Sequence, residues 1–149
     1  MADDNTLRYD RDIFLLNPTK RDQIVELRDV ERFGRDCFGN PNAVSLYGLS
    51  PQQWYERGIR ILARTTLEAV RDPLGRRIGE DIARVASTVP SGSAFSVVDP
   101  FAGSCNALFW ILRSLPGAQG LGVEFERAIF DMTAPQHCVA RCRHQSSAG

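Results

Sequence analysis

The sequence predicts an α/β fold in which a helical segment precedes a small parallel sheet. An apolar run over residues 95–99 ends in Asp99 and a turn of small residues, and a second apolar run over 120–124 ends in Glu124. The segment between them, 104–115, has the length of a helix. A strand, a helix and a second strand in this order are typical of parallel strands joined by a crossover helix.

The totals of the chain limit the classes of protein it can belong to. Its 149 residues suit one domain, and a hydrophobic fraction of 43% is too high for a disordered chain. The 18 basic and 18 acidic residues balance, so no net field attracts nucleic acid or an anionic membrane. There is neither a bilayer-length apolar run nor a signal-peptide pattern. We expect a cytoplasmic protein with no membrane association and with reduced cysteines.

Residues 1–75 predict an N-terminal arm and a helical segment. The arm extends to residue 18 and carries an apolar patch. A helix follows over 20–33 with Gly34 at its end, and glycine, asparagine and proline predict a loop over 34–49.

The strongest local signal predicts a long helix over 51–71. Residues 50–53 read as a capping box with proline at the first helical position. Trp54 falls on the apolar face, whereas Arg64 and Glu68 fall on the opposite face, which we expect to be solvated.

A second helix is predicted over 77–88, after the Asp-Pro-Leu-Gly sequence at 72–75 ends the first. The apolar side chains expected to face inward from it are Ile78, Ile82 and Val85.

The turn after Asp99 is the candidate site. Asp99 ends a strand that we expect to be buried, and backbone N–H groups gather at the start of the next helix. Gly103 allows the backbone to approach a ligand closely. Glu124 follows Gly103 by 21 residues and ends the next strand, a position that suits a carboxylate holding two ribose hydroxyls. The sequence therefore predicts a pocket for a nucleoside cofactor.

Two strings in this region, Asp-Pro-Phe-Ala-Gly-Ser at 99–104 and Gly-Val-Glu at 122–124, resemble the motifs of S-adenosylmethionine-dependent methyltransferases. The resemblance is greatest to those that methylate exocyclic amines of DNA or RNA bases, and it covers roughly residues 78–132. It implies a Rossmann-like fold that binds S-adenosylmethionine, with Glu124 on the ribose and Phe125 near the adenine. The cofactor-binding residues it implies are Asp99, Pro100, Phe101, Ala102, Gly103, Ser104, Glu124 and Phe125. No metal ligand is implied.

The chain departs from the family pattern in two ways. Cys105 stands where the pattern has its second glycine. If that position requires a positive φ, a non-glycine residue costs about 1–2 kcal/mol, which lowers affinity by about tenfold. The Asp/Asn-Pro-Pro-aromatic loop that orients the target amine is absent on both sides of the motif, so the catalytic residues are unknown.

Residues 134–149 show no helical or strand period, and they contain both histidines of the chain. We expect a disordered tail, which arises from truncated or out-of-frame coding or is a flexible native end. A zinc site is a weaker alternative because the ligand spacing matches no common structural site. Its ligands would be His137, Cys138, Cys142 and His144.

These observations predict a helical segment over 1–75, the cofactor-binding half of a Rossmann-like domain over 76–133, and a tail over 134–149. Two parallel strands are marginal, and an unpaired edge attracts another chain. We therefore expect self-association or a hetero-oligomer, with DNA or RNA reached through a fuller homologous subunit. The function expected is that of a truncated, S-adenosylmethionine-binding methyltransferase-family protein. The alternative is a non-catalytic interaction module acting with a partner subunit.

Overall fold

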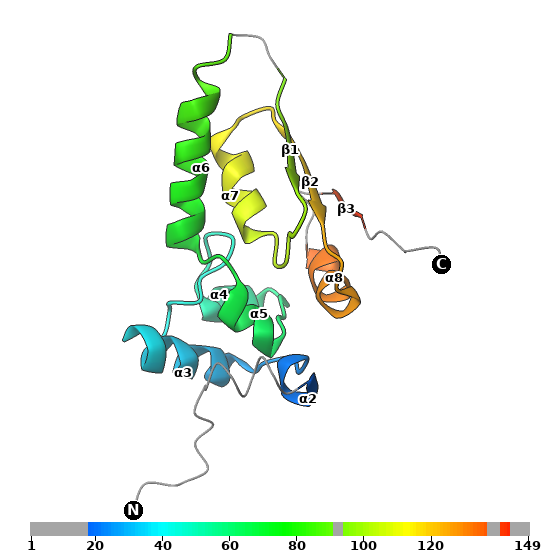
Figure 1. The fold of residues 1–149 in the computed structure, drawn as a ribbon. Helices are drawn as coiled ribbons and strands as arrows, with labels where there is room; N and C mark the ends of the chain where they lie inside the picture. The colour runs from blue at the N-terminus through cyan, green and yellow to red at the C-terminus, as the bar shows by residue number, and fades with distance from the viewer. Residues whose placement is uncertain (1–17, 91–93, 137–140, 144–149) are drawn as a thin grey trace, which may run out of the picture.

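A computed structural model describes residues 18–90, 94–136 and 141–143 and shows a mixed α/β arrangement of helices with a small parallel sheet (Figure 1). Helices α3, α4 and α5 lie together at one end, and α7 packs between α6 and the sheet (Figure 1). Among the described residues, no helix combines the length and the apolar character needed to cross a bilayer. The elements are α2 (Pro18–Arg21), α3 (Leu27–Phe38), α4 (Pro51–Glu56), α5 (Ala63–Glu68), α6 (Asp72–Ala86), β1 (Ser96–Asp99), α7 (Asn106–Ser114), β2 (Gln119–Val123), α8 (Arg127–Thr133), the 3-10 helix η1 (Ala134–Gln136) and β3 (Arg141–Arg143).

The sheet is parallel, with the strand order β1-β2-β3. Ser96 pairs with Gln119 and Asp99 with Gly122, so the carboxyl ends of β1 and β2 lie at the same edge. The η1 helix and β3 fall within 134–149, where the sequence predicted no regular structure. Residues 137–140 and 144–149 of that segment lie outside the described residues.

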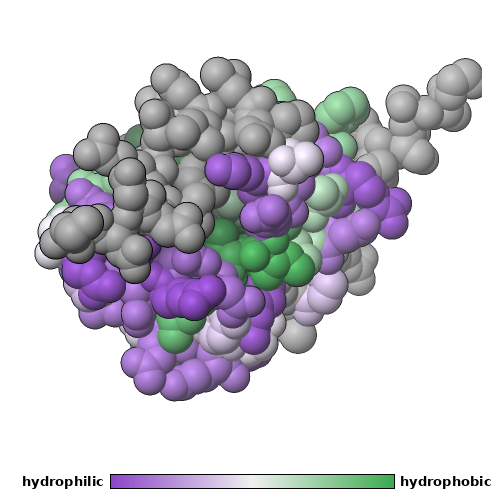
Figure 2. All heavy atoms as spheres, turned by 90° about the horizontal axis from the view of Figure 1, so that it is seen from below, coloured by the Kyte–Doolittle hydropathy of each residue, from purple (hydrophilic) through white to green (hydrophobic). Residues whose placement is uncertain are grey.

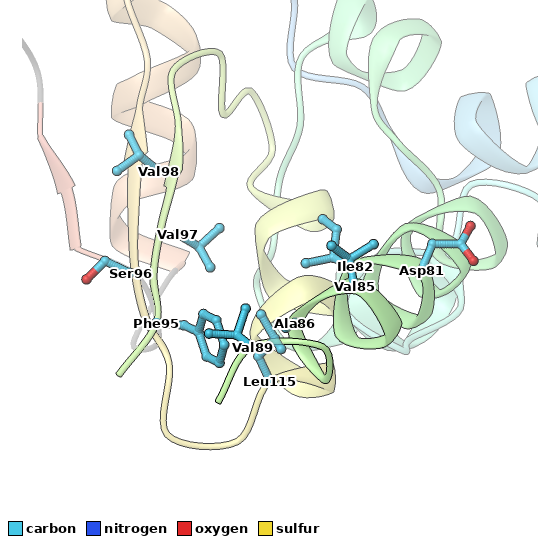
Figure 3. Close-up of a pocket in the computed structure, with 10 residues that line it drawn as sticks. All are labelled: Asp81, Ile82, Val85, Ala86, Val89, Phe95, Ser96, Val97, Val98 and Leu115. Atoms are coloured by element: carbon cyan, nitrogen blue, oxygen red, sulfur yellow. The ribbon is translucent and has the colours of Figure 1, made fainter. Parts of the chain in front are cut away.

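The prediction that Val97 and Val98 form a buried strand is wrong, because Val97 is only half-buried and Val98 is exposed. Val97 points toward α6 and α7, whereas Val98 points to the opposite side of the strand (Figure 3). Val98 is 59% exposed because, among the described residues, the helices cover only one face of β1.

The prediction of one long helix over 51–71 is also wrong. The structure has two short helices there, α4 and α5. The capping box of Ser50 and Gln53 is present as predicted. Gly58, with φ 79°, then ends α4, and the N–H of Ile59 donates to the carbonyl of Trp54 at 3.0 Å, as in a Schellman motif. The chain turns at this point, so the side chains of α5 do not continue the face of α4.

The core of the N-terminal segment surrounds Trp54, which is fully buried as predicted and donates from its Nε1 to the carbonyl of Val44 at 3.0 Å. The helix expected over 20–33 is instead α2 and α3, and α3 continues past Gly34 to Phe38. Gly34 lies within the helix because its missing Cβ leaves room for the carbonyl of Asn40. The other members of this core are Val25, Val30, Phe33, Val44, Leu46, Ile61 and Ala63.

Helix α6 begins at Asp72 rather than at residue 77, since the Asp-Pro pair starts the helix instead of ending the previous one. It approaches α7 most closely at Gly75 and Gly79, whereas of the predicted apolar stripe Ile78 is half-buried and Ile82 is exposed. A Cβ at Gly79 would lie 2.5 Å from the carbonyl oxygen of Trp110. Val85, predicted to face inward, is 69% exposed, because the glycine face takes the contact with α7.

Candidate functional site

A cavity of about 470 Å³ opens at the carboxyl ends of β1 and β2. This volume lies within the range of roughly 300–1,000 Å³ that is typical of small-molecule sites. The turn after β1, the first turn of α7, Glu124 after β2 and the end of α5 contribute its walls. The cavity therefore combines the sheet with the N-terminal segment.

The structure brings most of the predicted cofactor-binding residues into this one cavity. Pro100 and Phe125 are not among its lining residues, and Phe125 is 80% exposed. The predicted residues that do line it are Asp99, Phe101, Ala102, Gly103, Ser104 and Glu124.

The turn is held by hydrogen bonds from its own backbone N–H groups. The Oδ1 of Asp99 accepts from the N–H of Phe101 at 3.1 Å, and the N–H of Ala102 donates to the carbonyl of Val123 at 2.9 Å, which joins the turn to β2. Gly103 has φ 49° and Cys105 has φ 55°, both in the left-handed region. Position 105, where the family pattern has glycine, therefore does adopt a positive φ. Cys105 occupies a backbone conformation that favours glycine.

Glu124 is oriented by two backbone donors. Its Oε2 accepts from the N–H of Gly103 at 2.9 Å, and its Oε1 accepts from the N–H of Glu126 at 2.7 Å. A carboxylate has about four acceptor positions, so about two remain for a ligand. This is the number needed by the two hydroxyls of a ribose.

The sequence did not predict that α5 and the residues after it form one wall of the cavity. Thr65 and Glu68 line the cavity together with Ala69 and Val70. Glu68 was assigned to a solvated face, and it is exposed, but the break at Gly58 places it at the cavity. Three carboxylates, those of Glu68, Asp99 and Glu124, therefore line one cavity.

Arg64 was also expected in solvent and is instead buried. Its Nε lies 3.2 Å from Oδ1 of Asp22, and its Nη1 lies 3.5 Å from Oε2 of Glu126. The pair with Glu126, at the start of α8, connects the N-terminal segment to the chain that leaves β2.

A second hollow, of about 580 Å³, lies along the edge of β1 that faces away from β2. Ile82, Val85 and Val89 approach it from the α6 side, and Phe95 and Val97 line it from the strand side (Figure 3). The carboxylate of Asp81 points away from it (Figure 3) and pairs with Arg77 and Arg84. This groove offers apolar surface and no converging polar groups, so it does not compete with the first cavity as a small-molecule site.

Of the titratable groups in the part of the chain that the structure describes, Tyr55 and Arg127 have a raised pKa, and both lie outside the cavity. The pKa of Tyr55 is raised mainly by the hydrogen bond from its hydroxyl to Glu26, at 2.6 Å. The pKa of Arg127 is raised mainly by its hydrogen bond to Asp131. No cluster of three or more metal-ligating side chains occurs among the described residues. The zinc alternative depends on tail residues outside them.

Comparison of the chain with models of known protein families, with curated proteins and with solved structures returned no match. The assignment of a function therefore depends on the motif and on the geometry of the cavity.

Proposed function

We propose that this chain binds S-adenosylmethionine in the cavity at the carboxyl ends of β1 and β2, as a methyltransferase-family protein with ancestral specificity for a nucleic-acid base amine. One observation carries the proposal. Asp99 ends β1, Glu124 follows the adjacent parallel strand β2, and both line a single cavity beside the glycine turn. Ligands of open α/β sheets bind at this edge, and an acidic residue after the second strand is suited to a ribose.

The chemistry of the lining fits this cofactor. S-adenosylmethionine carries a sulfonium and an ammonium group, which favour an environment of carboxylates. Asp99 and Glu68 supply negative charge, and Glu124 keeps acceptor positions for the ribose diol. The parallel order β1-β2-β3 is also the order of one half of a Rossmann-like sheet.

The residues of this chain bind and orient the cofactor, and the sulfonium makes the methyl group transferable once the cofactor is bound. Transfer to an amine also requires a group that aligns the acceptor nitrogen with that methyl. The Asp/Asn-Pro-Pro-aromatic loop that performs this task is absent from the sequence. A fuller homologous subunit that carries the acceptor-binding loop, and contacts DNA or RNA, would complete the reaction.

The test is isothermal titration calorimetry with S-adenosylmethionine. We expect the wild type to bind and Glu124→Gln to bind about tenfold or more weakly, because charge-assisted hydrogen bonds to the ribose are lost. Glu80→Gln is the matched control, since Glu80 is exposed on α6 and is not a lining residue. Equal affinities of the two variants would contradict the role of Glu124.

A second candidate is a non-catalytic module that acts with a partner subunit. The edge of β1 that no strand pairs within the described residues, and its apolar groove, favour it. The same titration separates the two candidates, because this module has no need of the cofactor. Absence of heat with the wild type supports the module and rejects the first proposal.

A further inference from the structure

The two non-glycine residues with positive φ among the described residues are Tyr47, at 57°, and Cys105, at 55°. They are far apart in the sequence, but hydrogen bonds connect their surroundings. The Tyr47 hydroxyl donates to the carbonyl of Ser104, the residue before Cys105. The Tyr47 N–H donates to Oδ1 of Asn106, the residue after Cys105, at 2.7 Å. Tyr47 therefore holds the turn on both sides of its strained residue.

Buried acceptors anchor the other end of this arrangement. Asn106 donates from Nδ2 to the carbonyl of Val70 at 2.7 Å and to Oδ1 of Asp72 at 3.0 Å. Asp72, which is 6% exposed, also accepts from Nε1 of Trp110 at 2.7 Å and from the N–H of Gly48 at 3.0 Å. Each donor reaches Asp72 from a distant part of the chain, so the network fixes three segments against one another.

Backbone strain of this kind persists where the surroundings over-determine it, and such places are often ligand sites. Ser104 and Asn106 both line the candidate cavity. Without the bonds from Tyr47, the left-handed conformation at Cys105 would lose support on both sides. The population of molecules with a correctly shaped turn would then fall, and the apparent affinity for a ligand would fall with it.

We propose that Tyr47 is a positioning residue, which holds the turn over residues 99–105 in its ligand-binding conformation through Ser104 and through Asn106 and Asp72. The ligand in this inference rests on the proposed function. The N-terminal segment is accordingly part of the cofactor site, although its residues carry none of the motif.

The experiment compares Tyr47→Phe with the matched control Tyr55→Phe, whose hydroxyl bonds Glu26 away from the cavity. We expect Tyr47→Phe to weaken binding of S-adenosylmethionine by roughly three- to tenfold, the effect of one neutral hydrogen bond. Tyr55→Phe should bind like the wild type.

A second measurement needs no ligand. In labelled protein, Tyr47→Phe should shift the carbonyl carbon resonance of Ser104 and the amide nitrogen resonance of Cys105, and Tyr55→Phe should leave both in place. Introducing Cys105→Gly removes the strain, so the effect of Tyr47→Phe on affinity should shrink in that background.

The outcomes separate the inference from the proposed function. Unshifted Ser104 and Cys105 resonances in Tyr47→Phe overturn the inference, and so does an unchanged affinity in a protein that binds the cofactor. A wild type that fails to bind S-adenosylmethionine overturns the proposed function and the ligand named here. In that case the resonance shifts of Ser104 and Cys105 alone test whether Tyr47 positions the turn.

Discussion

Cys105 is the residue whose backbone can be tested most directly. Its side chain is 1% exposed and its φ is 55°. Replacing it with alanine or with glycine removes the sulfur in both cases, but only glycine removes the Cβ that clashes in this conformation. We expect Cys105→Gly to be more stable than Cys105→Ala by about 1 kcal/mol, measured by urea denaturation.

The control for this comparison is Ala83, in the interior of α6. There the backbone is helical, so Ala83→Gly should destabilise the protein by roughly 1 kcal/mol, opposite in sign to the difference at Cys105. An alanine variant of Cys105 as stable as the glycine variant would show that the turn does not hold a left-handed residue.

For single residues, the sequence predicts those parts of the cavity that lie in the motif around Asp99 and Glu124. Asp99 and Glu124 line one cavity because Asp99 ends β1 and Glu124 directly follows β2, and neighbouring parallel strands end at the same edge. That these residues bind the cofactor stays a prediction. Tyr47 and Glu68 were missed because their contribution depends on packing against the distant turn, and no local pattern encodes it.

At the scale of helices and strands, the close approach of α6 to α7 depends on Gly79, which has no side chain. A Cβ at Gly79 would lie 2.5 Å from the carbonyl oxygen of Trp110 and 2.7 Å from Oγ of Ser114. Helix propensity alone would make Gly79→Ala stabilising by up to about 1 kcal/mol. The backbone carbonyl cannot move aside, so we expect net destabilisation of about 1–3 kcal/mol, seen as a lower Tm.

Glu80→Ala is the neighbouring control, because Glu80 is exposed on the same helix. It should leave Tm nearly unchanged. A gain of stability in Gly79→Ala would mean that the two helices do not approach as closely as the structure shows.

The elements also show which boundaries local signals can predict. The ends of β1, α7 and β2 lie within two residues of the predicted ones, because glycine, proline and small residues mark the turns between strand and helix. The helices before them were predicted less well. Gly34 continues a helix and leaves room for the carbonyl of Asn40, whereas Gly58 adopts φ 79° and ends one, and no local pattern distinguishes the two.

For the whole molecule, the decisive feature is that the described helices cover only one face of β1. In the described part of the face seen from below, hydrophilic residues adjoin a limited apolar patch (Figure 2). Along β1, in contrast, an edge that no described strand pairs adjoins an apolar groove, and Val85 of α6 and Val89 after it are exposed beside it. Such an edge can pair with the same edge of a second copy about a two-fold axis. With 18 basic and 18 acidic residues, two copies carry no net repulsion.

We therefore expect this protein to associate with itself through β1, and Val98→Lys tests this. Val98 is 59% exposed and lines the groove, and Leu74, the control for the same substitution, is 55% exposed near the start of α6 and lies outside it. A charge beside the strand edge opposes pairing, so Val98→Lys should raise the concentration at which the protein associates by about tenfold. Leu74→Lys should behave like the wild type in sedimentation velocity. Equal effects of the two substitutions, or a monomeric wild type at every concentration, would show that the edge of β1 does not drive association.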